Sequence, residues 1–482
     1  MNKKIIIYSI SRIMLICVAL MIIPLLTSLY FKEDIYVTMA YVKSMAISLL
    51  VFGPLIFIKP ENTNLYIKEG FIITALTWVL MSFFGCLPMY LSGNIKSIID
   101  CFFEMSSGLT TTGASIITDL SIIDNSIKLW RSMSHFVGGM GVLVLALAVL
   151  PEISASSVHA MKAEVPGPQF GKLLPKIKSS ARILYGIYVV MTIVLIIALI
   201  IVGMPIFDSI NHALATAGTG GFGMHNGSIL YYNSPAIELV LSIGMLVFGV
   251  NFNLYYMILI KRGRDAIKSE ELKMYLAVVL VSTLIIFFNT RFLYEDVFRG
   301  LVDSFFSVSS IITTTGFVTA DFNMWPTLSK WILILLMFIG GSAGSTAGGL
   351  KVSRVLIAMK SSINEVKKMV NPGIKLALMY DEKPLEKNIE DSILKYIVIY
   401  FLLYALFVVF ITIAGPDFES SFAAVAATYN NVGPGLGIVG PIGNYSSFSD
   451  IGKLILSFVM ITGRLEIFPI LILFSPNTWR KD

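Results

Sequence analysis

A series of long apolar runs limits the fold of this chain more than any other feature. A helix that crosses a bilayer needs about 20 mostly apolar residues, and ten runs approach or reach that length. Only 14% of the 482 residues are charged, against roughly 25% in a soluble domain. We therefore predict an all-α polytopic membrane protein. The expected spans are Ile5–Tyr30, Tyr36–Ile58, Phe71–Leu91, Leu129–Leu150, Ile183–Val202, Ile237–Ile260, Tyr275–Phe288, Trp331–Met359, Leu394–Ile413 and Ile451–Leu473.

The positive charges indicate the orientation of these spans. Lys and Arg gather in the connections 162–182, 261–273 and 360–395, whereas 205–234 and 415–449 contain none. Cytoplasmic connections carry an excess of Lys and Arg. This alternation predicts that both termini are cytoplasmic, in agreement with an even number of spans. The first run is too long for the ~7–15-residue apolar core of a cleaved signal peptide, so we expect it to remain as a span.

Four of the external connections are copies of one another. In three of them an acidic residue precedes a glycine by thirteen positions, namely Asp100–Gly113, Asp208–Gly221 and Asp303–Gly316, and in the fourth, Glu419–Gly433, by fourteen. One apolar span precedes each copy and another follows it. We predict two leading spans plus four span–pore half-helix–span repeats around one pseudo-fourfold pore. The expected segments are 1–69 (leading two-span segment), 70–181 (pore repeat 1 and cytoplasmic linker), 182–270 (pore repeat 2), 271–392 (pore repeat 3 with a Gly-rich gate loop and cytoplasmic linker) and 393–482 (pore repeat 4).

The repeated unit has the properties of a cation pathway. A half-helix of about ten residues cannot cross a bilayer, and the non-helical loop that returns it must face protein or a water-filled cavity. An acidic residue near the helix start suits the positive end of the helix dipole, so the negative end points toward the glycine loop. Glycine allows successive carbonyls to face one axis, and rings of carbonyls replace the hydration shell of a cation.

The loops and spans carry a set of distinctive motifs. These are TTTGA at 110–114, TGGF at 219–222, TTTGF at 313–317, NNVGPGLG at 430–437, HFVGGMG at 135–141, GGSAGSTAGGLK at 340–351 and GRLE at 463–466. Together they resemble the motifs of the Trk/Ktr/HKT superfamily of K⁺ transporters, and the length and the two leading spans favour its TrkH type. This resemblance implies potassium uptake across the bacterial inner membrane by a multi-pass protein.

The resemblance also assigns a selectivity filter, with K⁺ as the transported ion. Each filter segment has one key glycine, which predicts fewer ordered sites and weaker K⁺/Na⁺ discrimination than in K⁺ channels. In HKT relatives a serine in the first copy accompanies Na⁺ transport, so Gly113 favours K⁺. The implied filter residues are Thr111, Thr112, Gly113, Thr219, Gly220, Gly221, Thr314, Thr315, Gly316, Asn431, Val432 and Gly433.

A glycine-rich stretch interrupts the span Trp331–Met359. Each glycine costs about 1 kcal/mol in a helix, so 340–351 is a poor helix. Small residues also allow helices to pack closely, and that interpretation stays open beside an intramembrane gate below the filter, which the resemblance implies. The gate residues expected in this stretch are Gly340, Gly341, Ser342, Gly344, Ser345, Gly348, Gly349 and Lys351.

Arg464 is a charge inside an apolar run. Such residues are costly and face a partner or an aqueous cavity. One interpretation is a structural ion pair with a carboxylate such as Glu466, although residues two apart point to different helix faces. In the family the matching arginine faces the pore beneath the filter as an electrostatic barrier, so Arg464 completes the expected gate.

Other function classes receive little support. A dinucleotide fingerprint comes directly after a strand, whereas the GxGxxG patterns at 218–223 and 435–440 do not. We therefore expect no nucleotide on this chain. No cluster of titratable or metal-binding side chains indicates an enzyme. The resemblance implies a TrkA-like cytosolic ring that binds NAD(H) and ATP/ADP, and a homodimer; no nucleic acid is expected. Symport with H⁺ or Na⁺ and a Na⁺-permeable, HKT-like transporter stay open, although the absence of an obvious embedded carboxylate relay favours channel-like flux.

Overall fold

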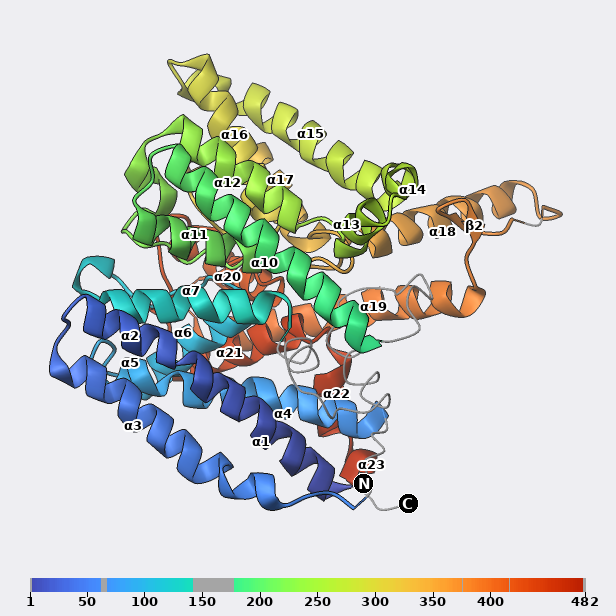
Figure 1. Ribbon diagram of the computed structural model, residues 1–482. Coiled ribbons are helices and arrows are strands. Elements are labelled where there is room, and N and C mark those ends of the chain that lie inside the picture. Colours follow the sequence, from blue (N-terminus) through green and yellow to red (C-terminus); the bar gives the residue numbers. More distant parts are fainter. Residues whose placement is uncertain (1, 62–66, 142–176, 375, 416, 480–482) are drawn as a thin grey trace.

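The computed structural model describes residues 2–61, 67–141, 177–374, 376–415 and 417–479. In this part of the chain the only strands are two short ones, β1 (Met379–Tyr380) and β2 (Lys383–Pro384), which pair in an antiparallel hairpin. Nearly all other regular structure is helical, as Figure 1 shows. The predicted all-α class is therefore confirmed. The end of the fourth expected span and the basic connection up to residue 176 lie outside the described residues.

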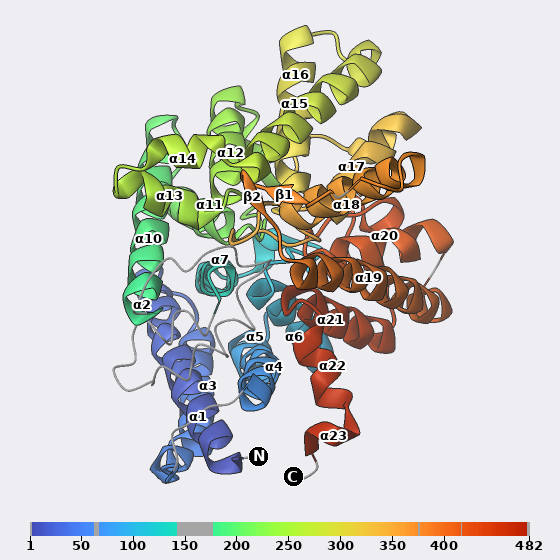
Figure 2. The same ribbon diagram turned by 90° about the vertical axis from the view of Figure 1, so that its right-hand side faces the viewer.

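The chain begins with a leading helical segment. Helix α1 packs against both α3 and α4, which attaches this segment to the first repeat. The first helix and the last described helix, α23 (Pro476–Trp479), lie at the same end of the molecule in both views (Figures 1 and 2). The elements up to the first half-helix are α1 (Lys3–Leu20), α2 (Ile22–Tyr30), α3 (Ile35–Phe52), η1 (Pro54–Phe57), α4 (Ile67–Gly85) and α5 (Leu87–Leu91).

In every repeat, the helix before the half-helix is long enough to cross a membrane. These helices are also poorly covered by protein in the last three repeats, where 22–28% of the most apolar window is buried. Uncovered apolar surface of this extent suits contact with lipid. The helices are α4 with α5, α10 (Ile177–Ile201), α15 (Glu270–Thr290) and α19 (Lys387–Ala414).

The helix after the half-helix is broken or short in every repeat. The second repeat bends by 86° between two helices, and the third is interrupted by the glycine-rich stretch. Of the ten expected spans, the described residues therefore contain six long helices, or up to seven with the bent pair as one. The helices concerned are α7 (Asn125–Gly139), α12 (Pro235–Phe248) with α13 (Phe252–Leu259), α17 (Thr327–Ile339) with α18 (Val352–Val370), and α21 (Asp450–Arg464) with α22 (Phe468–Phe474).

The four half-helices are 12 to 16 residues long and largely buried. Side chains cap most of their starts: Ser97, Asp296 and Asp417 each accept a hydrogen bond from a first-turn amide. Asp303 was expected near a helix start, and this is wrong, because the third half-helix begins earlier, at Val297 with Asp296 as its cap, and leaves Asp303 in its middle. The half-helices are α6 (Ile98–Leu109), α11 (Ile206–Gly218), α16 (Val297–Ile312) and α20 (Phe418–Tyr429).

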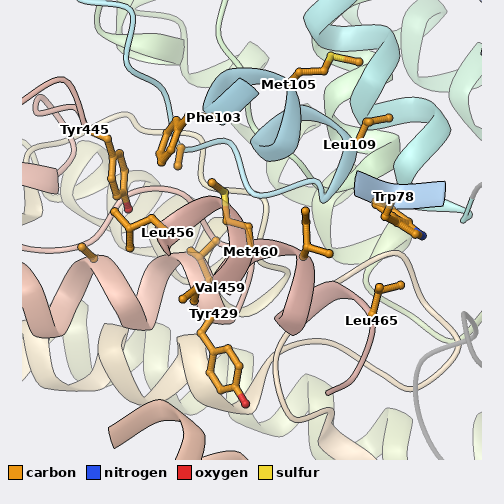
Figure 3. Close-up of a cluster of buried hydrophobic side chains, with 14 of the residues drawn as sticks. Trp78, Phe103, Met105, Leu109, Tyr429, Tyr445, Leu456, Val459, Met460 and Leu465 are labelled. Carbon is orange, nitrogen blue, oxygen red and sulfur yellow. The ribbon is translucent and has the colours of Figure 1, made fainter. Parts of the chain in front are cut away.

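Apolar side chains from different repeats pack together around the half-helices. Figure 3 shows one such cluster, in which Trp78 of α4 and Phe103 of α6 share a core with Tyr429 of α20 and Met460 of α21. The first and fourth repeats are thus in contact, although they lie at opposite ends of the sequence. The remaining short elements are η2 (Leu120–Ile122), η4 (Ser228–Tyr232), α14 (Gly263–Lys268), η5 (Arg291–Leu293), η6 (Phe322–Met324) and η7 (Gly437–Val439).

Candidate functional site: a ring of four glycine loops

Each half-helix ends in the same backbone turn. One or two residues after the helix, a non-glycine residue adopts the left-handed conformation: Thr111, Thr219, Thr314 and Asn431 have φ of 55–56°. In the first copy the amide of Thr112 donates to Ser107 O at 2.9 Å, and the other three copies repeat this bond at 2.8 Å. This is the Schellman pattern that satisfies the last carbonyls of a helix. The left-handed residue was not predicted, because glycine is the usual residue at that position.

The four loops close into a ring through their key glycines. A Cβ added to Gly113 would lie 2.0 Å from Gly220 O, one on Gly221 would lie 1.9 Å from Thr315 O, and one on Gly316 would lie 2.0 Å from Val432 O. The ring closes where Gly433 approaches Thr112 O, with 2.6 Å to such a Cβ. All four glycines also have φ between 74° and 96°. Only glycine fits these positions, and the structure brings all twelve predicted filter residues together.

The side chains of the loops are turned to the protein. Thr110 and Thr112 share a hydrogen bond of 2.7 Å between their hydroxyls, and the side-chain Nδ2 of Asn431 donates to Thr112 Oγ1 at 2.9 Å. By contrast, within the described residues no protein donor reaches the carbonyl oxygens of Thr315 and Val432, nor that of Thr112. Buried carbonyls normally have a partner. This ring can therefore offer its oxygens to a cation that has lost its water.

The glycine-rich stretch, residues 340–351, lies directly against two of these loops. It is non-helical between α17 and α18. The Gly348 amide donates to Thr314 Oγ1 at 2.7 Å, and a Cβ on Gly348 would lie 2.2 Å from Asn430 O. The predicted gate residues Gly340, Gly341, Ser342, Gly344, Ser345, Gly348, Gly349 and Lys351 all belong to this loop.

The loop is also held from its other side. The Ser342 amide donates to Gly249 O at 2.9 Å, and Gly344 O accepts the Phe252 amide at 3.1 Å. The loop thus contacts the bend between α12 and α13. Helix packing by small residues alone, the other interpretation of this stretch, would need a continuous helix here, whereas the stretch forms an irregular loop.

Arg464 ends α21 and connects three repeats. Its guanidinium is mostly buried and donates to Thr346 O at 2.7 Å in the loop, and to Gly138 O and Gly139 O at 2.7 and 2.6 Å at the end of α7. Glu466, considered as its partner in an ion pair, instead lies 2.6 Å from Arg354 of α18. Arg464 therefore lies against the glycine-rich loop, with carbonyl oxygens as its hydrogen-bond acceptors, and its role as a barrier in the pore stays a prediction.

Two functional candidates were missed in the sequence. Glu271, near the start of α15, accepts the amides of Ala343 at 2.6 Å and Ser353 at 3.2 Å, so one carboxylate holds both ends of the loop. Glu104 of α6 pairs with Arg131 of α7 behind the first glycine loop at 2.7 Å. The signal available in the sequence was a charged residue within an apolar helix, but the sequence does not identify the partner of such a residue.

A helical membrane protein in which four half-helices carry a closed ring of glycine loops has the architecture expected of a membrane protein that transports ions. The family model for TrkH, a cation transport protein, matches residues 38–294 and 276–481. This chain belongs to the TrkH family.

Individual relatives agree with this assignment. The Trk system potassium uptake protein TrkH of Salmonella typhimurium is 36% identical over 96% of both chains, and that of Halomonas elongata is 34% identical over 96% of both. The crystal structure of the potassium transporter TrkH from Vibrio parahaemolyticus superposes with a TM-score of 0.90 at 30% identity, and the match covers 100% of each chain. The predicted family and fold are thereby confirmed.

Proposed function

We propose that this chain is a potassium uptake pathway of the bacterial inner membrane, with the ring of four glycine loops as its selectivity filter. The observation that carries this proposal is the closed ring itself, in which each key glycine abuts the carbonyl of the next repeat. The potassium transport of its relatives supports K⁺ as the ion. A multi-pass membrane protein of this family is a transporter, and we propose no enzymatic activity.

Conduction is controlled below the filter by the glycine-rich loop and Arg464. The loop contacts the third and fourth filter segments through Gly348, and Arg464 fixes it through Thr346 O. A unit positive charge close to the ion path repels a cation in a medium of low dielectric constant. Withdrawal of Arg464 together with the loop would remove both obstacles at once.

A cytosolic nucleotide-binding ring of the TrkA type would exert this control, and the protein would act as a homodimer with both termini in the cytoplasm. Helix α18 and the β1–β2 hairpin extend from the helical bundle (Figure 1) and carry Lys360, Lys367, Lys368 and Lys383 of the basic connection 360–395. Their continuity with the gate loop, which ends where α18 begins, offers a direct mechanical route to the filter. The basic residues also suit anionic lipid headgroups.

The test is rescue of a bacterium that lacks its own potassium uptake systems. Wild-type protein should restore growth at low K⁺, and Gly113→Ala should not, because its Cβ would overlap Gly220 O. Gly186→Ala on α10 is the matched control, since a Cβ there meets no atom within 4 Å. Absence of rescue by wild-type protein at normal membrane abundance would refute the proposal.

Symport with H⁺ or Na⁺ is separated from channel-like flux by the reversal potential in proteoliposomes. A potential that follows the K⁺ gradient alone indicates a channel. A shift with pH or with the Na⁺ gradient indicates coupling, and a Na⁺ permeability equal to that of K⁺ would place the chain with Na⁺-permeable transporters.

A further inference from the structure

A buried ion pair lies behind the first filter segment. Arg131 of α7 and Glu104 of α6 are 2% and 0% exposed, and the Arg131 Nε and Nη2 atoms lie 2.8 and 2.7 Å from Glu104 Oε1. Removing two charges from water is expensive, and a buried pair is weak support for a gain in stability. The contacts of the two side chains show which parts of the filter the pair holds in position.

The carboxylate of Glu104 holds the segment that leaves the first filter loop. Oε1 accepts the hydroxyl of Ser115 at 2.9 Å, and Oε2 accepts the amide of Ile116 at 3.0 Å. These residues follow Gly113 by two and three positions. Hydrogen bonds to an ionised acceptor are about twice as strong as neutral ones. The position of the segment after Gly113 therefore depends on the buried charge of Glu104.

The guanidinium of Arg131 reaches the second filter segment as well. Its Cζ atom lies 4.0 Å from the ring centre of Phe222, the residue after Gly221. One turn along α7, His135 Nε2 accepts the Phe222 amide at 3.3 Å, while its Nδ1 lies 2.8 Å from Gly108 O. Helix α7 thus fixes the outer ends of two adjacent filter segments through one arginine and one neutral histidine.

The fourth segment joins the same network through Tyr445. Its amide donates to Ser115 O at 2.9 Å, and its hydroxyl donates to the carbonyl of Gly433 at 2.7 Å. Figure 3 shows the Tyr445 ring facing Phe103 of α6, with 5.5 Å between the ring centres. The first segment therefore contacts the Glu104 carboxylate directly, the second is connected to it through Arg131, and the fourth through Ser115 and Tyr445.

Only the first repeat has a carboxylate at the centre of this network. Glu104 lies nine positions before its filter glycine, and the corresponding residues of the other copies are His212, Ser307 and Ala424. The fourfold backbone of the ring is thus braced asymmetrically. A carbonyl ring discriminates between ions by the size of its site or by the number and field strength of its carbonyls. The Glu104–Arg131 pair and its contacts, called the brace below, affect selectivity by fixing where these carbonyls lie.

We propose that Arg131 and Glu104 are positioning residues for ion selectivity, which hold the outer ends of the filter segments of repeats one, two and four at the spacing that suits K⁺. A segment released from this network can move toward the axis and accommodate the smaller Na⁺. The inference rests on the proposed function as a potassium pathway. It concerns selectivity, and the gate loop does not enter it.

Two variants of the full chain in proteoliposomes test the brace, with reversal potentials measured between K⁺ and Na⁺ solutions. Arg131→Lys keeps the charge but loses the planar fork, and Ser115→Ala removes one donor to Glu104 while the ion pair remains. Each loses interactions of about 1 kcal/mol, so we expect the Na⁺/K⁺ permeability ratio to rise by about fivefold. The control is Trp130→Phe, which removes a buried 2.8 Å hydrogen bond to Gly85 O from the same helix without touching the filter.

The expected result is a raised ratio in both brace variants and an unchanged ratio in Trp130→Phe, whatever its loss of thermal stability. An unchanged ratio in Ser115→Ala and Arg131→Lys would overturn the brace, and so would an equal rise in Trp130→Phe, which would signify general loosening. If Arg131→Lys fails to fold, Ser115→Ala alone decides. Wild-type protein without any K⁺ preference would refute the proposed function itself, together with this inference.

Discussion

Substitution of Gly221 by alanine isolates the close approach of two neighbouring filter segments. Gly221 has a φ of 74°, and its added Cβ would lie 1.9 Å from Thr315 O and 2.9 Å from the carbonyl carbon. The obstructing atoms are backbone, so no side-chain rotation relieves the overlap. Either the second and third segments separate, or Gly221 changes its conformation. In both cases the ring of carbonyls is distorted.

The free-energy cost of Gly221→Ala has two contributions. The left-handed conformation costs a non-glycine residue about 1–2 kcal/mol, and an extra methyl group in a packed site costs about 1–3 kcal/mol. The sum, about 2–5 kcal/mol, is smaller than the stability of a typical domain, ~5–15 kcal/mol. The variant should therefore fold and reach the membrane, while the intact ring becomes at least about tenfold less populated.

The assay is Rb⁺ uptake by cells that depend on this protein, normalised to its amount in the membrane. We expect at least a tenfold loss for Gly221→Ala and wild-type uptake for Gly186→Ala, which replaces a helix-interior glycine and stabilises α10 by about 1 kcal/mol. Normal uptake with normal ion preference in Gly221→Ala would show that the segments do not need this approach. A loss confined to protein abundance would contradict the reasoning equally.

Three further predictions concern the gate loop. Arg464→Gln should increase the rate of K⁺ flux in proteoliposomes, because it removes a charge and weakens bonds to three carbonyls; reduced flux with poor folding would indicate a structural role. Glu271→Gln should weaken each of the two hydrogen bonds that Glu271 accepts from the loop and its end by about 1 kcal/mol, and K⁺ flux should increase several-fold. Unchanged flux would show that Glu271 does not hold the loop in place. Thr314→Val keeps the side-chain shape but leaves the Gly348 amide without its 2.7 Å acceptor, at a cost of about 1–3 kcal/mol; protease cleavage or hydrogen exchange of 340–351 should increase, and unchanged exchange would count against the contact.

The parts of the fold that could be predicted are those encoded by periodic or local signals. Long apolar runs indicated the spans, and the constant spacing of Asp100, Asp208 and Asp303 from their glycines indicated the repeats. The same spacing was misleading about the start of the third half-helix, because Asp296 caps that helix about two turns before Asp303. The bend after α12 was not predicted, since one glycine and one asparagine at 249–251 are a weak signal inside an apolar run.

Pairings between distant residues could not be predicted from the sequence. Glu466 was weighed as a partner for Arg464 because they are neighbours in the chain, yet it pairs with Arg354, 112 positions away. The same limit concealed the link between Glu271 and the loop, 72 positions away. Composition shows that a charge in an apolar helix needs a partner, but only packing selects which one.

The ring combines a fourfold backbone with supporting contacts that differ between the repeats. The four loops share the left-handed residue, the capping bond and the glycine contact, so an ion at the centre would meet similar carbonyls from each side. Behind them, the first loop is held by Glu104, the third contacts the gate loop through Thr314, and the fourth contacts the first through Asn431. Because these supports have no residue in common, changes behind the first loop should alter ion preference, and changes below the third should alter flux.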